Sequence, residues 1–525
     1  MAADSGSTER LLIIGWDGAD WEILDDLMSR GDLPNFAHML GTGSRADLMS
    51  TIPSHSWAAW STFLTASGPG KHGVYDFVER NPRNPNQRIP VTSSSLKMIT
   101  FPEMLSRAGH EVRIGNVPVT FPPLVVRGRM ISGVTIPPRA PFVHPPEWSN
   151  ELERVAPFPV NGMEWKRYES HPEALVEEAR RFVEERTRSF EVMLEGSWDV
   201  AVCVYVAPDR LQHPLGAYLL PSHPSHAEVS DSPLGESIRE VFRILDQAID
   251  RLTAVAGSRT TVVVMSDHGF RPINRSANLN KLLGELGFAA RSSTAGVTTR
   301  VRRVPLAQAV ARTRLGRAIK NRIAVPSTVD WSQTRAYQSA LGGGISINLS
   351  GREPSGVVDP RDFDAVRNDL RASLLGFRDP RTGDNPVQRV LTKEELFSGP
   401  YIDLAPDLLV EPSPLWTLSH TDELTSTTEW PSGAHRRKGI LVATGPGVGE
   451  EDLGERQIAD VGATALAFCG LRPPDLDGKV IESLAGQAAA EATPQDLSLH
   501  RPTEELSEED QDHIARHLRD LGYIE

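Results

Sequence analysis

In the stretch LLIIGWDG, Leu11–Gly18, the acidic residue Asp17 comes directly after a short apolar run. An uninterrupted apolar run of this length is typical of a strand that is buried on both faces of a parallel sheet. A carboxylate directly after such a strand is costly to bury unless it is paired with a cation or bound to a metal ion. The stretch therefore predicts a buried strand that delivers Asp17 to a site at its carboxyl end.

The same pattern occurs twice more along the chain. The segment VAVCVYVAPDRLQH leads from an apolar run to Asp209 and His213. The segment TVVVMSDHG leads from another apolar run to Asp267 and His268. Ligands of open parallel sheets bind beyond the carboxyl ends of the strands. Three strands would therefore bring five ligand-type side chains to one edge of the sheet.

The spacing of these side chains favours metal binding. Asp209 and His213 are four residues apart, so a helical segment would place both on one face, where they could chelate one ion. Asp267 and His268 are neighbours, and at the exit of a strand both can turn toward one ion. A further candidate is His435 in GAHRRKGILVATGPG, just before another apolar run. The alternative interpretation of His435 is an exposed loop histidine.

Short apolar runs rich in β-branched residues alternate with longer helical patterns along the chain. This alternation is typical of βαβ units and predicts an α/β fold with a mostly parallel sheet. The predicted strands are residues 11–16, 111–117, 199–207, 261–266 and 439–445. The predicted helices are residues 172–194, 237–255 and 457–469.

The predicted domain organisation is a discontinuous α/β core with one insertion. The core comprises residues 1–287 and 346–485, residues 288–345 form an inserted basic cap, and residues 486–525 form a linker and a C-terminal helix. A chain of 525 residues is long enough for such a large core with insertions.

Three segments carry signals of their own. Residues 118–147 hold eight prolines, too many for regular structure, and predict a long ordered loop. Ser507, with Asp510 three residues further on, predicts the start of the C-terminal helix. Residues 291–329 contain nine Lys or Arg and no Asp or Glu. This basic segment is either a solvated helix face or a lid that attracts an anionic substrate.

The composition limits the possible functions. The chain is 39% hydrophobic and 24% charged, as is ordinary for a globular protein, and its net charge of −14 argues against nucleic acid as a stable partner. No apolar run approaches the ~20 residues of a membrane helix, so we expect no membrane segment and a cytoplasmic protein. Cys203 and Cys469 lack metal-ligand spacing and are expected to be buried thiols.

A hydroxyl-rich segment is the natural place to look for a nucleophile. The segment STIPSHSWAAWSTFLTASGPGKHG, residues 50–73, carries eight hydroxyl side chains. A Ser/Thr-rich loop that leads into a helix is ordinarily a cap, so the segment alone does not identify a reactive residue.

The motifs IIGWDGA, PDRLQH, SDHG and GAHRRKGILVATGPG, in this order, resemble the type I phosphodiesterase and nucleotide pyrophosphatase branch of the alkaline phosphatase superfamily. The segments GNVPVTFPP, GGGISINLSGREP and DLDGKVI extend the resemblance over roughly residues 10–485. The resemblance implies an alkaline-phosphatase-like three-layer sandwich with a mostly parallel central sheet and an inserted cap.

The resemblance also implies two divalent metal ions, usually zinc, with manganese as the alternative. Asp209, His213 and His435 would hold one ion, and Asp17, Asp267 and His268 would hold the other together with the nucleophile. Family members with the pattern TxPAWTSFxTG align with SWAAWSTFLTA, which makes Ser56 the implied nucleophile. Thr51 is the second choice, because TIP imitates the TFP start of other members.

The resemblance implies that the protein hydrolyses a small phosphate ester through a covalent phospho-serine intermediate. Phosphodiester or nucleotide pyrophosphate bonds are the first choice for the bond that is cleaved. Trp16, Trp57 and Trp60 are candidates for an aromatic wall around the substrate, and core packing is the alternative for each. Lys71 and His72 in GPGKHG are candidates for holding phosphate, and an ordinary surface turn is the alternative.

Rival interpretations remain within and outside the superfamily. A sulfatase would show a CxPSR-like motif and a phosphoglycerate mutase NSEVGH, and both motifs are absent. A phosphomonoesterase or a phosphonate hydrolase would use the same ligands. Outside enzymes, the chain would be a metal-stabilised binding protein that has lost catalysis.

Overall fold

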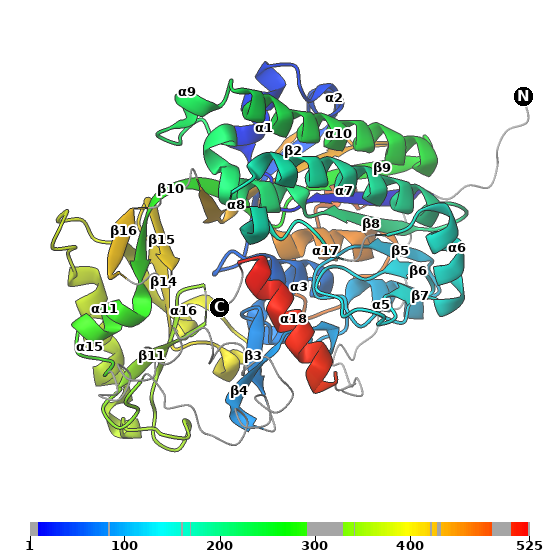
Figure 1. The fold of residues 1–525 in the computed structure, drawn as a ribbon. Coiled ribbons are helices and arrows are strands. Elements are labelled where there is room, and N and C mark those ends of the chain that lie inside the picture. The colour runs from blue at the N-terminus through cyan, green and yellow to red at the C-terminus, as the bar shows by residue number, and fades with distance from the viewer. Residues whose placement is uncertain are drawn as a thin grey trace, which may run out of the picture. The chain divides into compact units, whose positions relative to one another are not determined.

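The computed structural model describes residues 9–81, 84–158, 161–168, 170–290, 329–340, 342–419, 423–427, 432–485 and 506–522. The chain divides into two compact units, each with its own core (Figure 1). The first unit comprises residues 1–274, 393–405 and 428–525, and the second comprises residues 275–392 and 406–427.

The first unit is built around a mostly parallel sheet. Among the described residues this sheet has nine strands in the order β19-β2-β18-β9-β1-β8-β5-β6-β7. Their bounds are β1 Arg10–Trp16, β2 Ser44–Met49, β5 Val112–Gly115, β6 Gly128–Ile131, β7 Val143–His144, β8 Val200–Tyr205, β9 Thr260–Met265, β18 Lys438–Thr444 and β19 Asp452–Gln457. The predicted α/β fold and the five predicted strands are confirmed.

The central strands are parallel, antiparallel pairs flank them, and the edge strand β19 pairs in parallel with β2. β1 pairs in parallel with β8 and β9, and β5 pairs in parallel with β8 and β6. β18 is antiparallel to both β9 and β2, and β7 is antiparallel to β6. Every residue of β8 and β9 is buried, as continuous apolar runs in a covered sheet require.

Helices cover both faces of this sheet (Figure 1). On one face α7 (Pro172–Met193) packs against α10 (Pro233–Ala256), and on the other α17 (Ile458–Phe468) packs against α3 (Ser56–Thr65) and α5 (Phe101–Arg107). α10 begins at Ser232, whose side chain accepts a hydrogen bond from the backbone of Gly235. The three predicted helices are confirmed as α7, α10 and α17.

The described part of the first unit contains further helices and strands. They are α1 Trp21–Ser29, α2 Pro34–Thr42, α4 Pro69–His72, β3 Val78–Asn81, β4 Asn84–Pro90, α6 Ser149–Val155, the 3₁₀ turn η3 Trp165–Tyr168, α8 Ala207–Leu219, α9 His226–Val229, α16 Lys393–Leu396, β17 Gly433–Arg436 and α18 Glu508–Asp520. β10, Gly269–Asn278, starts in the first unit and ends in the second.

The proline-rich segment and the C-terminal helix were expected from the sequence. Residues 118–147 run mainly without regular structure, but β6 and β7 interrupt the predicted loop because their residues contain no proline and can pair with a neighbouring strand. The C-terminal helix begins as predicted, with the backbone of Asp510 donating to Ser507 Oγ at 3.1 Å. The linker before residue 506 lies outside the described residues.

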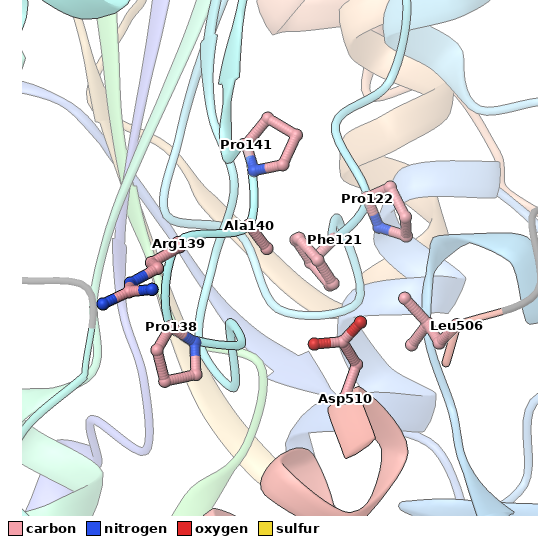
Figure 2. Close-up of a pocket in the computed structure, with 8 residues that line it drawn as sticks. All are labelled: Phe121, Pro122, Pro138, Arg139, Ala140, Pro141, Leu506 and Asp510. Carbon is pink, nitrogen blue, oxygen red and sulfur yellow. The ribbon is translucent and has the colours of Figure 1, made fainter. Parts of the chain in front are cut away.

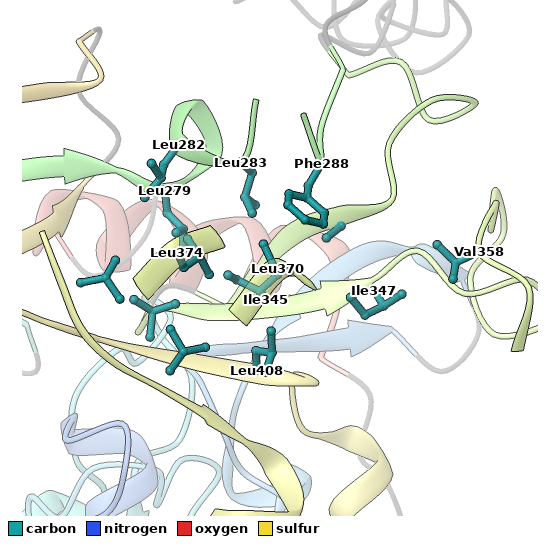
Figure 3. Close-up of a cluster of buried hydrophobic side chains, with 14 residues drawn as sticks. Leu279, Leu282, Leu283, Phe288, Ile345, Ile347, Val358, Leu370, Leu374 and Leu408 are labelled. Atoms are coloured by element: carbon teal, nitrogen blue, oxygen red, sulfur yellow. The ribbon is translucent and has the colours of Figure 1, made fainter. Parts of the chain in front are cut away.

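The second unit has its own antiparallel sheet and core. The sheet consists of β11 (Ala336–Ala340), β12 (Gly344–Ile347), β14 (Leu408–Pro412) and β13 (Val387–Thr392), in this order. Among the described residues this unit also contains the helices α11 (Leu279–Glu285) and α15 (Phe363–Gly376) and the strands β15 (Leu415–Ser419) and β16 (Thr425–Thr427). Figure 3 shows buried side chains of this core, among them Leu282, Ile345 and Leu370.

The second unit is larger than the insertion predicted at 288–345. Its strands β13 and β14 lie outside that range but pair with each other and, through β14, with β12. A change in composition along the chain cannot reveal such long-range pairing. Residues 291–328 of the predicted basic cap lie outside the described residues.

Cys203 and Cys469 were expected to be buried thiols. Both cysteines are buried, and burial raises the pKa of the Cys203 thiol well above its ordinary value.

In the described part of the chain, none of the helices combines the length and the apolar character needed to cross a membrane.

Candidate metal centre

The three central strands end at the same level, which brings their C-terminal residues together. Trp16 at the end of β1 is in register with Tyr205 of β8, and Gly15 is in register with Met265 of β9. The backbone N–H of Asp17 donates to the carbonyl of Tyr205 at 3.0 Å. The residues that follow β1, β8 and β9 therefore meet at one edge of the sheet, as the sequence predicted.

One group of ligand-type side chains consists of Asp209, His213 and His435. Nε2 of His435 lies 3.0 Å from both Oδ1 of Asp209 and Nε2 of His213, and the last two atoms are 3.4 Å from each other. Asp209 and His213 lie four residues apart on α8, and His435 comes from β17. The sequence therefore placed these three residues correctly with respect to one another.

A second group surrounds His268. Asp17, Asp209 and His268 offer ligand atoms that lie within 4.8 Å of one another. Nε2 of His268 is 3.6 Å from Oδ1 of Asp17 and 3.3 Å from Oδ2 of Asp267. The rings of His268 and His435 stack with their centroids 3.8 Å apart, so the two groups are adjacent. All six predicted ligands are thus brought together.

The hydroxyl of Ser56 lies inside the second group. Ser56 Oγ donates to Oδ1 of Asp17 at 3.2 Å and lies 3.3 Å from Nε2 of His268. Ser56 is the first residue of α3, and the ring Nδ1 of the N-cap residue His55 accepts a hydrogen bond from the backbone of Ala58 at 3.4 Å. The hydroxyl therefore lies at the positive end of the dipole of a ten-residue helix.

Thr51, the second choice for the nucleophile, is placed differently. Its Oγ1 donates to the carbonyl of Pro53 at 2.7 Å, a local contact that forms within the loop. Within the described residues, no hydrogen bond joins Thr51 to any of the predicted ligands. The structure brings Ser56, and not Thr51, to the predicted ligands.

The electrostatics of the centre call for a cation. Burial, followed by repulsion from Asp267 and Asp209, raises the pKa of Asp17 well above its ordinary value. Burial and the charge of Asp209 raise the pKa of Asp267 to about 7. Burial opposes ionisation of Asp209 as well, but His213 and His435 hold the pKa of Asp209 well below its ordinary value. Three neighbouring carboxylates would repel one another without a compensating charge.

The donor atoms fit a divalent metal ion. Oδ2 of Asp267 is buried and has no hydrogen-bond partner among the described residues, although Oδ1 accepts from the backbone of Gly18 at 3.2 Å. Nδ1 of His435 lies 2.9 Å from the carbonyl of Ser54 and Nδ1 of His268 lies 3.2 Å from that of Gly269. If each Nδ1 carries the proton, each Nε2 is left as a lone-pair donor, which is the usual arrangement of metal-bound histidines. Carboxylate and imidazole ligands suit zinc or manganese.

Two supporting contacts were not anticipated from the sequence. The indole Nε1 of Trp60 donates to Oδ2 of Asp17 at 3.0 Å and so orients this ligand. The guanidinium of Arg436, next to His435, forms two hydrogen bonds with the buried carboxylate of Asp20. Helical spacing offered a signal for the first contact, because Trp60 lies one turn after Ser56 on α3.

The remaining candidates have other contacts. Trp16, Trp57 and Trp60 are at most 2% exposed, so in this structure their rings pack in the interior. The amino group of Lys71 lies 2.7 Å from Oδ1 of Asp477. His72 is buried, and its Nε2 lies 3.0 Å from Oγ1 of Thr62. Apart from the hydrogen bond from Trp60 to Asp17, none of these contacts involves a predicted metal ligand.

The fold and this cluster agree with the resemblance carried by the sequence motifs. Residues 11–436 match the family described as Type I phosphodiesterase / nucleotide pyrophosphatase. The chain belongs to this family and is a hydrolase of phosphoric esters.

Two solved structures share the fold. Phosphonoacetate hydrolase from Sinorhizobium meliloti 1021, in complex with phosphonoacetate, has a TM-score of 0.56 at 16% identity, over 87% of this chain and 95% of that chain. Murine ectonucleotide pyrophosphatase / phosphodiesterase 5 has a TM-score of 0.50 at 14% identity, over 94% of this chain and 100% of that chain. No curated protein sequence matches the chain significantly. At these identities the structural likeness concerns the fold.

Proposed function

We propose that this protein is a two-metal phosphodiesterase in which Ser56 is the nucleophile. The observation that carries the proposal is the position of Ser56 Oγ, 3.2 Å from Asp17 Oδ1 and 3.3 Å from His268 Nε2, at the first residue of α3. A hydroxyl at a helix N-terminus among buried carboxylates and imidazoles is placed for attack on phosphorus.

The metal ligands are proposed residue by residue. One ion would be held by Asp209, His213 and His435, and the other by Asp17, Ser56, Asp267 and His268. When bound, two divalent ions supply positive charge to the phosphoryl oxygens and acidify a neighbouring hydroxyl. We propose zinc, with manganese as the alternative, because the donor set is oxygen and nitrogen.

The residues of the chain define two half-reactions. In the first, Ser56 loses its proton and its Oγ forms a bond to phosphorus while the phosphorus–oxygen bond to the leaving group breaks. The leaving alcohol takes up a proton and departs. In the second, water attacks the phospho-serine, the bond between phosphorus and Ser56 Oγ breaks, and the serine regains a proton. The backbone N–H groups at the start of α3 stabilise negative charge on the phosphoryl group in both steps.

The product is a phosphate monoester if the substrate is a diester. Nucleotide pyrophosphate bonds would be cleaved by the same two half-reactions, because the attacked atom is again a phosphorus with an oxygen leaving group.

The small substrate is proposed to reach the centre past His213 and His435, whose side chains are 19% and 14% exposed.

Phosphonate hydrolysis is a second candidate function. The observation in its favour is the structural likeness to phosphonoacetate hydrolase at a TM-score of 0.56. A phosphonatase would break a carbon–phosphorus bond, so it needs a carbon leaving group that is stabilised as it departs. Phosphomonoesterase activity would instead require groups that bind a third non-bridging oxygen.

One experiment separates these functions. Purified protein is assayed for bound metal and, with Zn²⁺ or Mn²⁺ supplied, for hydrolysis of bis-p-nitrophenyl phosphate, p-nitrophenyl phosphate and phosphonoacetate in parallel. The proposal predicts two metal ions per chain and fastest turnover of the diester. Preference for phosphonoacetate would favour the second candidate. Bound metal without turnover of any substrate would identify a metal-stabilised protein that has lost catalysis.

A further inference from the structure

Arg186 on α7 is a buried cation without a counter-ion. Its side chain is 1% exposed, and its Nε, Nη1 and Nη2 atoms have no hydrogen-bond partner among the described residues. It also forms no ion pair within that part of the chain. A charged donor that is buried without a partner is strongly unfavourable, so the surroundings of Arg186 need an explanation.

The guanidinium of Arg186 lies against two aromatic rings. Its Cζ is 3.5 Å from the ring centroid of Phe158 and 3.9 Å from that of Phe182. Such contacts attract the positive charge to the rings. They supply no oxygen or nitrogen acceptor, so the N–H groups of the side chain are still without a hydrogen bond.

Other buried arginines of the chain do have carboxylate partners. Arg113 and Arg239 are 5% and 9% exposed. A nitrogen of Arg113 lies 3.1 Å from Glu111, and a nitrogen of Arg239 lies 2.6 Å from Glu236. The missing partner is therefore a particular property of the place where Arg186 lies.

A second buried arginine is close to the first. Arg210 on α8 is 1% exposed, and its Nη1 donates to the carbonyl of Gly162, whereas its Nε has no partner in the described part of the chain. Burial, followed by the charge of Arg210, lowers the pKa of the Arg186 guanidinium well below its ordinary value. Arginine nevertheless keeps its proton in proteins, so loss of a proton cannot relieve the repulsion. The pair therefore requires a negative charge.

The nearby carboxylates do not provide this charge at short range. Oε1 of Glu164 lies 3.1 Å from Nδ1 of His517 on α18. Glu185 acts on Arg186 from a longer distance, and its Oε1 lies 4.0 Å from Nε of Arg181. These two carboxylates are thus directed toward other cations.

The C-terminal helix α18 shields the Arg210 side of the pair from water. Burial lowers the pKa of His517 on this helix, and the nearby charge of Arg210 adds to the shift. Arg139, in contrast, is exposed, so water can solvate its charge. It lines a pocket of about 290 Å³ at the start of α18, together with Phe121, Pro122, Pro138, Ala140, Pro141, Leu506 and Asp510 (Figure 2).

We propose that Arg186 and Arg210 form a buried binding site for a small oxyanion of the phosphate and sulfate class. The planar fork of a guanidinium group matches two oxygens of such an anion, and the anion neutralises its charge. The bound anion would join α7 to α8 and so stabilise the helix that carries Asp209 and His213. This inference does not rest on the proposed function, because no metal ligand takes part in the site.

Thermal unfolding of the full-length, metal-loaded protein in sodium sulfate tests the site, from about 0.1 to about 10 mM at constant ionic strength. Each tenfold increase above the Kd should raise the Tm of the unmodified protein by about 1–2 °C. Arg186→Met keeps an apolar chain between the rings and removes the charge, so it should show little or no such rise. At the lowest sulfate concentration it should be at least as stable as the unmodified protein, because an unpaired buried charge is gone.

Arg188→Met is the matched control. Arg188 lies on the same helix but is exposed, so its variant should keep the sulfate dependence of the unmodified protein. The general stabilising effect of sulfate, and any sulfate at the metal centre, are common to all three proteins, whose metal content is measured as well. The difference between the slopes therefore isolates Arg186. Equal slopes for the unmodified protein and Arg186→Met would overturn the inference.

X-ray diffraction covers the case in which Arg186→Met does not fold. Crystals of the unmodified, metal-loaded protein are soaked in selenate, which has the shape and charge of sulfate and is located by the anomalous signal of selenium. The inference predicts a selenate ion within hydrogen-bond distance of the Arg186 guanidinium. Selenate at other places only, or none at all, would contradict it. Neither test involves hydrolysis, so their outcomes are independent of the proposed function.

Discussion

Nε2 of His435 on β17 lies 3.0 Å from Oδ1 of Asp209 on α8, although 226 residues separate them in the chain. The two residues reach each other because β17 pairs with β10, which directly follows the strand-end residues Asp267 and His268. The contact and the strand pairing therefore link the ends of β8 and β9 to the last predicted ligand. A site of this kind is formed by the tertiary structure and binds metal only in the folded protein.

Removal of one histidine ligand should remove metal. His213→Ala is expected to lower the metal content by at least one ion per chain, because the ion loses one of its proposed ligands. Diester hydrolysis should fall roughly 100-fold or more as a result. Metal analysis of the purified variant by mass spectrometry checks this. His226→Ala is the control, since His226 is a buried histidine whose Nδ1 lies 2.8 Å from the carbonyl of Ala217. Unchanged metal content in His213→Ala would contradict the ligand assignment.

The hydrogen bond from Trp60 to Asp17 should tune the metal site. Trp60→Phe keeps a buried aromatic ring but removes the donor that lies 3.0 Å from Asp17 Oδ2. Loss of such a partner typically costs about 10–100-fold in metal affinity or activity. Competition with a fluorescent zinc chelator measures the affinity.

Trp198→Phe serves as the control for this variant. Trp198 is also buried and its Nε1 also donates a hydrogen bond, in this case to the carbonyl of Leu194 at 2.8 Å. It should lose stability without loss of metal affinity. Equal metal affinities of the two variants would show that Trp60 only packs.

The ion pair between Arg436 and Asp20 should stabilise the fold next to His435. Burial raises the pKa of Asp20, and the guanidinium of Arg436 opposes this shift. Arg436→Met leaves the fully buried carboxylate of Asp20 without its cation and should lower the free energy of unfolding by about 3 kcal/mol. This value is at the lower end of the range for a broken buried pair, because Arg436 is 32% exposed. Urea unfolding of the metal-free protein measures this.

A surface pair provides the comparison. Arg472 and Glu482 are 47% and 69% exposed, so Arg472→Met should lower the stability far less than Arg436→Met does. If both variants lose the same stability, the buried pair does not have the role described for it.

Acid should destabilise the protein through His72. Burial lowers the pKa of His72 from 6.5 to about 3, and its Nδ1 accepts a hydrogen bond from the backbone of Val74 at 3.1 Å. Between these pH values the unfolded chain binds a proton that the folded chain does not, so stability is complete above pH 6.5 and falls as the pH falls. The loss from this residue is at most about 1.4 kcal/mol per pH unit.

Urea unfolding at pH 7, 6, 5 and 4 tests this dependence. His72→Gln should be less stable at pH 7 but should show a flatter decline toward acid. His38→Gln, which changes an exposed histidine on α2, should follow the unmodified protein. An unchanged slope in His72→Gln would contradict the assignment of the acid sensitivity to this residue.

The strand-end ligands could be predicted from the sequence for a physical reason. A carboxylate after a fully apolar strand has few stable environments, so the positions of Asp17, Asp209 and Asp267 along the chain predict that they are ligands. The local composition alone does not decide between Ser56 and Thr51, and the resemblance of SWAAWSTFLTA to the family pattern made Ser56 the first choice. That choice depends on where α3 begins relative to β1.

Other features depend on contacts between distant segments. Trp60 was a candidate for an aromatic wall around the substrate, with core packing as the alternative, and its buried indole donates to Asp17. The boundaries of the second unit follow from the pairing of β13 with β14. The pairing of β13 with β14 leaves no periodic pattern in the sequence that would reveal it.

The role of Ser56 is tested most directly by three alanine variants, Ser56→Ala, Ser61→Ala and Thr51→Ala, in which metal content and kcat for bis-p-nitrophenyl phosphate are measured together. Ser61 is a buried serine of the same helix whose Oγ has no hydrogen-bond partner in the described part of the chain, so it controls for the substitution itself. We expect Ser56→Ala to retain most of its metal and to lose at least about 1000-fold in kcat, while the other two variants keep near-normal activity. Full activity in Ser56→Ala would contradict the proposed mechanism, and loss of activity in Thr51→Ala instead would identify Thr51 as the nucleophile.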